Sequence, residues 1–160
     1  MDTKRYLILL LLASCTANSP WKLDAIATGH AAFDSARLLY LGEAGKDPLR
    51  LEFLRTQEEI ACFLSLTQFS FHAPKTLQAE FRTENGSFKE FLPLLEGKMR
   101  LRLSNEATEF LIRSLKDGDE VVILVDGFEK TFRPDGFPKV YDQWLKNSLF
   151  LINPLKGPIE

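Results

Sequence analysis

The side chains that most often carry catalysis or bind metals are scarce in this sequence. Its two histidines are His30 and His72, and its two cysteines are Cys15 and Cys62. A structural zinc site needs four ligands at short spacing, and no His-x₃-His or Cys-x₂-Cys pair occurs. The Gly-x-Ser-x-Gly motif of hydrolases and the Gly-x-x-x-x-Gly-Lys phosphate loop are also absent. We therefore predict no metal site, no cofactor and no enzymatic activity.

Acidic residues offer two further candidates for chemistry. Asp24, His30 and Asp34 lie close enough in the sequence to form an acid–base cluster. Asp-Gly pairs resemble the start of calcium loops, but the closely spaced carboxylates of such a loop are missing. Because Asp-Gly is common turn chemistry, we interpret the pairs as turns and the cluster as structural. The pairs are Asp117-Gly118, Asp126-Gly127 and Asp135-Gly136.

Cys62 has the spacing of a core residue. It alternates with Ile60 and Leu64, and in a strand these three side chains share one apolar face. A thiol on such a face is more often a packed core group than a nucleophile. We predict that Cys62 is buried and unpaired.

The first fifteen residues have the order of a bacterial secretory signal. Lys4 and Arg5 precede an apolar run at 6–13, which is too short to span a membrane. The run leads into Leu12-Ala13-Ser14-Cys15, which resembles the lipobox of bacterial lipoproteins. The resemblance implies that Cys15 receives a diacylglyceryl group, that the residues before it are removed, and that the new amino terminus is often acylated.

This resemblance divides the chain into a signal peptide at 1–14, a lipidated tether at 15–20 and one globular domain at 21–160. It implies a cell-envelope protein anchored to a membrane through the lipid on Cys15. Residue 16 is Thr rather than Asp. In enteric-type bacteria the family's sorting rule then indicates the outer membrane rather than the inner one. The alternative is an ordinary secreted protein with a chance cysteine at its cleavage site.

The composition favours a folded, weakly acidic domain. The chain has 160 residues, of which 45% are hydrophobic and 13 are phenylalanine. Without Asp2, Lys4 and Arg5, the mature chain keeps 18 basic and 21 acidic residues, a net charge of −3. Nucleic-acid binding requires a strongly basic domain, so we exclude nucleic acid as a partner.

Alternating apolar residues predict antiparallel strands through the middle of the chain. The runs are Leu49/Leu51/Phe53, Ile60/Cys62/Leu64/Leu66, Leu77/Ala79/Phe81 and Met99/Leu101/Leu103. Asn85-Gly86 predicts a hairpin turn. Residues 21–41 are ambiguous, because 21–26 alternates like a strand whereas 33–41 fits either a helix or a strand.

The last third of the chain predicts helices around a hairpin. The first helix covers roughly 106–116, with Asn105 as N-cap and Gly118 after its end. A hairpin through Asp126-Gly127 follows, then a helix with Pro138 in its first turn and a final strand at 149–152. The predicted fold class is α+β: an antiparallel β-sandwich or partial barrel with two C-terminal helices flanking a β-hairpin.

Residues 99–145 also resemble the invasion-associated locus B-like envelope proteins. The similarity is in the order Leu-x-x-Gly, strand, Asp-Gly, strand and Gly-Phe, which here ends at Gly136-Phe137. The cysteines of that family are absent from this sequence. The resemblance therefore carries no functional residue onto this chain.

Lys98, Arg100 and Arg102 form the sharpest surface feature. They alternate with apolar residues, so in a strand they share one face at about 6.6–6.8 Å spacing. Such charges repel one another unless water, salt or an anionic partner screens them. We predict either docking of an anionic partner, such as lipid head groups or an acidic protein surface, or a solvated face balanced by acids such as Glu80.

Taken together, these features predict a membrane-anchored envelope lipoprotein with a non-enzymatic binding or structural role, whose partner is an envelope protein or an anionic surface. The alternative function is a carrier of a lipid or small apolar ligand in an aromatic-lined cavity. The aromatic residues considered for that cavity are Phe63, Phe69, Phe71, Phe88 and Phe91. A phenylalanine-rich core explains the same residues equally well.

Overall fold

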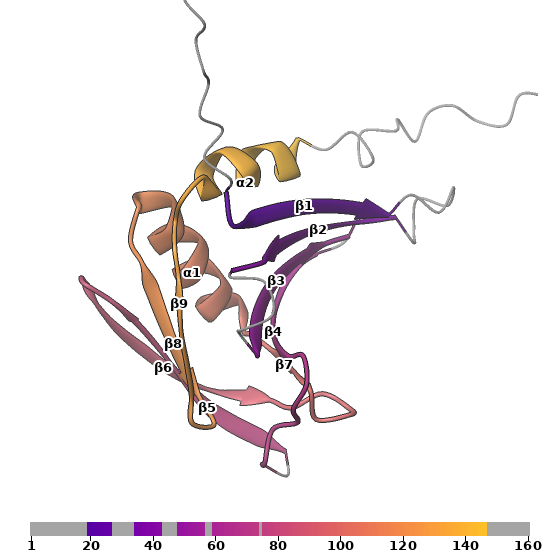
Figure 1. Cartoon of the computed structure of the whole chain (residues 1–160), viewed down its shortest axis with the longest axis vertical. Helices are drawn as coiled ribbons and strands as arrows, with labels where there is room; N and C mark the ends of the chain where they lie inside the picture. Colours follow the sequence, from indigo (N-terminus) through magenta and orange to yellow (C-terminus); the bar gives the residue numbers. More distant parts are fainter. Residues whose placement is uncertain (1–18, 27–33, 43–47, 57–58, 74, 147–160) are drawn as a thin grey trace, which may run out of the picture.

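Two antiparallel sheets and two helices make up the fold in the computed structural model (Figure 1). The structure describes residues 19–26, 34–42, 48–56, 59–73 and 75–146. The predicted fold class, an α+β antiparallel sandwich or partial barrel, is confirmed. The predicted signal peptide, Cys15, His30 and the strand at 149–152 lie outside the described residues.

Sheet A has the strand order β1-β2-β3-β4-β7, and sheet B has the order β6-β5-β8-β9. The strands of sheet A are β1 (Trp21–Ile26), β2 (Ser35–Tyr40), β3 (Leu49–Arg55), β4 (Ile60–Leu66) and β7 (Arg100–Arg102). The strands of sheet B are β5 (Thr76–Thr83), β6 (Gly86–Pro93), β8 (Val121–Val125) and β9 (Phe128–Phe132). The helices are α1 (Asn105–Asp117) and α2 (Phe137–Leu145).

The ambiguous segment near the N-terminus forms two paired strands. Trp21 lies opposite Tyr40, and Leu23 lies opposite Leu38. Ala36, Leu38 and Tyr40 are buried while the residues between them are half-exposed. That period of two belongs to a strand with one buried face, and the pairing with β1 and β3 selects it over the helical alternative.

Helix α1 begins one residue earlier than predicted. The N-cap is Ser104, whose hydroxyl accepts a hydrogen bond from the Ala107 amide at 3.1 Å, so the expected cap Asn105 is the first helical residue. The end of the helix agrees with the prediction, because Gly118 adopts a left-handed φ of 92° and closes it.

Both predicted hairpins are present. Asp126 and Gly127 have positive φ values of 48° and 80°, which is the turn that matches the twist of β8 and β9. In the other hairpin, Thr83 pairs with Gly86. The two turn residues are therefore Glu84 and Asn85, and Gly86 of the predicted Asn-Gly turn already begins β6.

A single apolar core connects the inner faces of both sheets to the helices. Figure 1 shows α1 between the two sheets and α2 across the end of sheet A beside β1. The rings of Tyr40 in sheet A and Phe132 in sheet B meet with centroids 5.0 Å apart. Helix α2 contributes Trp144, which is fully buried and donates its indole N–H to the carbonyl of Ala36 at 2.9 Å.

Candidate functional site

The predicted basic stripe is shorter in the structure than in the sequence pattern. Strand β7 contains only residues 100–102, and Lys98 lies in the preceding turn with a positive φ of 54°. Lys98 therefore does not continue the strand, and the expectation of three basic residues on one strand is wrong. Arg100 and Arg102 flank the buried Leu101 and share the outer face of sheet A.

Each arginine of β7 has an acidic partner on sheet A or beside it. Arg100 reaches over β4 to Glu52, with 2.8 Å between Nη2 and Oε2, and its guanidinium lies 3.7 Å from the centroid of the Phe63 ring. Arg102 pairs with Glu59 at 2.6 Å. The predicted balancing acid, Glu80, instead lies on sheet B and pairs with Arg82 and Lys89.

The strand register gathers further basic residues onto the same outer face. One row of cross-strand neighbours places Arg50 and Arg100 on either side of Ser65. A second row runs from Arg102 through Phe63, Glu52 and Leu39 to Lys22. A third row brings Arg37 beside Asp24. We call the five basic side chains Lys22, Arg37, Arg50, Arg100 and Arg102 the cationic face.

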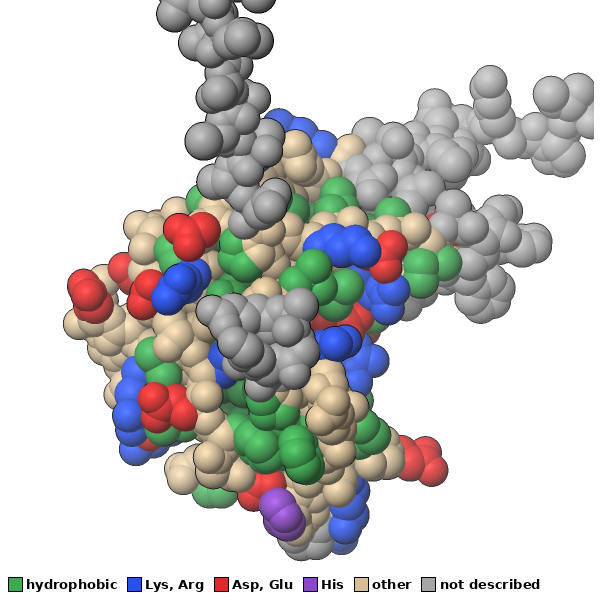
Figure 2. Space-filling view, in the orientation of Figure 1, with side chains coloured by type: hydrophobic (Ala, Val, Ile, Leu, Met, Phe, Trp, Pro, Cys, Tyr) green, Lys and Arg blue, Asp and Glu red, His purple; other side chains and the backbone are tan. Residues whose placement is uncertain are grey.

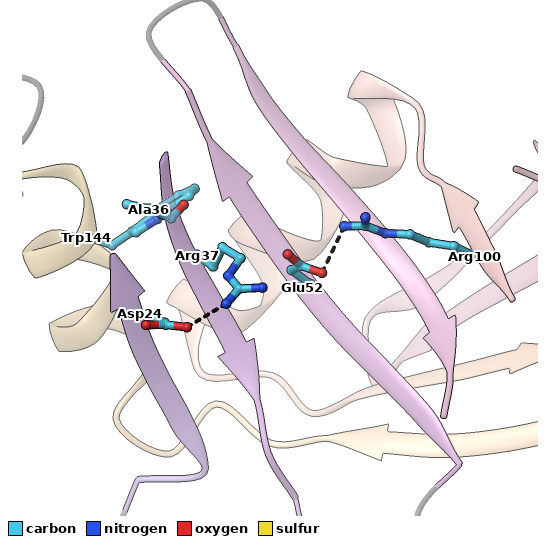
Figure 3. Close-up of polar contacts among 6 residues, drawn as sticks. All are labelled: Asp24, Ala36, Arg37, Glu52, Arg100 and Trp144. Carbon is cyan, nitrogen blue, oxygen red and sulfur yellow. Dashed lines mark hydrogen bonds and ion pairs between the residues drawn. The ribbon is translucent and has the colours of Figure 1, made fainter. Parts of the chain in front are cut away.

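The cationic face holds more positive than negative charge. Three acids pair with its arginines: Glu59 binds Arg102, Asp24 binds Arg37 at 2.6 Å, and Glu52 binds Arg100. Figure 3 shows the ion pairs of Asp24 and Glu52 side by side across the strands of the sheet. Neither Lys22 nor Arg50 forms an ion pair with any residue that the structure describes. Counted over the described residues, the face thus carries two uncompensated cations, although the chain as a whole is acidic.

The prediction for Cys62 is confirmed. The residue is fully buried opposite Phe53 and, among the described residues, forms no disulfide. Burial raises the pKa of its thiol well above the usual range, because a thiolate there would lose its hydration. Ala61 and Phe63 on the opposite side of β4 are buried as well. The guanidinium of Arg100 covers the Phe63 ring, which explains why β4 does not show one wet face.

His72 contacts a carboxylate, and we interpret this contact as one that fixes a loop, not as a catalytic pair. Its ring Nδ1 and its backbone amide lie 3.0 and 2.8 Å from the same Oδ2 of Asp126. The histidine side chain is 84% exposed, so water surrounds the ring. Both contacts fix the segment after β4 to the β8–β9 turn. In the predicted acid–base cluster, the carboxylate of Asp24 forms an ion pair with Arg37, and Asp34 is buried.

The five phenylalanines considered for a ligand cavity lie in separate places. Phe63 is on the outer side of sheet A, and Phe71 is buried. Phe88 stacks on Phe110 of α1 at 5.8 Å, whereas Phe91 is 67% exposed on β6. Phe69, 53% exposed, contacts the Phe128 ring at 6.2 Å. Figure 2 shows a group of hydrophobic side chains on the surface beside the purple side chain of His72.

Comparison with known proteins does not add a relative. No family model, no curated protein and no solved structure matches the chain. Among the described residues, no helix is long and apolar enough to cross a membrane, and no three histidine, cysteine or acidic residues are grouped to hold a metal ion. The lipoprotein and locus B-like resemblances stay predictions.

Proposed function

We propose that this chain is a membrane-anchored envelope lipoprotein that performs a binding role without catalysis, and that its cationic face docks on anionic phospholipid. The observation that carries the proposal is the gathering of five basic side chains, from four strands, on one sheet face of an acidic chain. Lipid at Cys15 and basic residues on the folded domain together give two membrane signals, and stable anchoring generally needs two.

The attachment of the N-terminal segment supports contact with the membrane. The Ser19 hydroxyl donates to the Asp135 carbonyl at 2.9 Å, and the Trp21 indole donates to the Arg133 carbonyl at 2.8 Å. The chain is thus fixed to the domain from Ser19 onward. From Cys15 to Ser19 an extended chain reaches at most about 14 Å. A lipid on Cys15 would keep the domain, including Lys22, close to the head groups.

The uncompensated charges set the expected size of the effect. A basic residue close to an anionic membrane contributes about 1 kcal/mol to binding. Lys22 and Arg50 would together contribute about 2 kcal/mol, or roughly thirtyfold in affinity at low salt. Salt screens exposed charges, so the effect should shrink as ionic strength rises.

The test measures vesicle binding without the lipid. The mature chain from residue 15, carrying Cys15→Ser, is mixed with vesicles that contain phosphatidylglycerol or only phosphatidylcholine. Binding should require phosphatidylglycerol and fall roughly thirtyfold in Lys22→Gln/Arg50→Gln. The control Lys75→Gln/Arg113→Gln removes the same charge from exposed positions outside sheet A, before β5 and on α1. Equal loss in both variants, or binding of neither vesicle, would disprove docking by this face and leave an envelope protein as the partner to seek.

A further inference from the structure

A pocket of about 390 Å³ opens between the start of β4 and the two helices. Ile60 and Ile112 line its apolar wall, and the ring of Tyr141 from α2 lies beside them. Glu59, Asn105 and Glu109 line the rest of it. The pocket therefore combines an apolar wall with two carboxylates. None of its residues belongs to the cationic face.

The Tyr141 side chain is held rigidly. Its ring packs against Phe137 at 5.4 Å and Trp144 at 5.5 Å, and the residue is only 7% exposed. No described residue forms a hydrogen bond with its hydroxyl. The pocket is thus lined by a fixed ring whose hydroxyl is not engaged by any described residue.

The two carboxylates that line the pocket differ in whether they already form an ion pair. Glu59 is paired with Arg102 at 2.6 Å. Glu109 has no ion-pair partner among the residues described. The ammonium group of Lys116 lies 5.3 Å from the centre of the Tyr141 ring, so the ring already attracts one cation. Glu109 is therefore the carboxylate available to an incoming ligand.

We infer that this pocket binds a small primary ammonium compound with an apolar body. An ammonium group has three N–H donors and no acceptor. Glu109, Asn105 and Tyr141 line the pocket, and each has a side-chain oxygen that can accept a hydrogen bond. The two isoleucines would contact the apolar body. A neutral alcohol of the same shape lacks the charge, and a carboxylate would be repelled by Glu59 and Glu109.

The experiment uses the full chain purified in neutral detergent and three probes of similar shape. These are 2-phenylethylammonium, 2-phenylethanol and 3-phenylpropionate, and binding is followed by NMR titration. The ammonium should bind saturably and about tenfold more tightly than the alcohol, the effect of one charge-assisted hydrogen bond. The carboxylate should not bind. Equal binding of the alcohol and the ammonium, or no saturable binding of either, overturns the inference.

Matched variants locate the binding. Glu109→Gln should weaken ammonium binding about tenfold, whereas Glu106→Gln, the same change on the same helix outside the pocket, should leave it unaltered. Tyr141→Phe keeps the ring and should still weaken binding severalfold. Lys116→Gln removes the competing cation and should tighten it. Equal weakening by Glu106→Gln and Glu109→Gln would mean that ammonium binding depends on the overall charge of the helix and would contradict a site in this pocket. Thermal unfolding of each variant verifies that it is folded.

Discussion

At the residue scale, Cys62 offers a direct check of strand β4. The thiol faces the core opposite Phe53, and burial raises its pKa, so the reactive thiolate is scarce and inaccessible in the folded chain. In Cys15→Ser protein near pH 8, alkylation of Cys62 should be at least about tenfold slower than in denaturant. Mass spectrometry of the alkylated protein measures both rates. Rapid labelling of the native protein would contradict the burial of β4.

The two cysteines have opposite predicted fates. Cys15 follows the lipobox and should carry acyl chains, whereas Cys62 is enclosed by the core. Metabolic labelling with a fatty-acid analogue should mark the wild type and Cys62→Ser, and should fail to mark Cys15→Ser. The Cys62→Ser variant is the matched control, because it also replaces a thiol by a hydroxyl. Label that persists without Cys15 would refute the anchor.

At the scale of single elements, the beginning of α1 distinguishes two neighbouring residues. Ser104 accepts from the Ala107 amide and also donates to Glu90 at 2.8 Å, whereas Asn105 is exposed in the first turn. Ser104→Ala should lower the free energy of unfolding by about 1 kcal/mol or somewhat more. Asn105→Ala should change it by less than about 0.5 kcal/mol. Chemical denaturation measures both, and the reverse order would restore Asn105 as the cap.

Helix α2 is attached to sheet A by ring contacts of Phe137 and by hydrogen bonds at Trp144. The indole N–H of Trp144 binds the Ala36 carbonyl, and Arg55 donates to the Trp144 carbonyl at the end of the helix. Trp144→Phe leaves that buried carbonyl without its donor and a void beside it, so the free energy of unfolding should fall by about 2–4 kcal/mol. Leu145→Ala, at a position 37% exposed, should cost clearly less. Equal effects in denaturant titrations would contradict this attachment.

At the scale of the whole molecule, the packing of apolar side chains stabilises the part of the chain that the structure describes. The core cluster spans both sheets and both helices, and its rings contact one another directly. We expect a metal chelator to leave the thermal unfolding midpoint unchanged. Calorimetry with and without the chelator measures this, and a large drop would reveal a stabilising metal ion.

The sequence alone predicted the elements whose signals are local. Alternation marks β3 and β5, because one face of each strand is buried and the next residue is not. The positive φ required at Asp126-Gly127 and Gly118 made the hairpin and the end of α1 recognisable. The buried thiol of Cys62 followed from the same alternation. These predictions depend only on neighbours a few residues away in the chain.

Only the tertiary structure decided which distant strands pair, and the cationic face depends on that pairing. No local sequence pattern links Lys22, Arg37 and Arg50 to Arg100 and Arg102. They meet because β1, β2, β3, β4 and β7 lie side by side in one register. The same pairing decides that residues 35–40 form a strand. It also decides where β7 begins, so that Lys98 lies in the turn before it. Backbone hydrogen bonds between strands form irrespective of side-chain type, so a local pattern identifies a strand without identifying its partner.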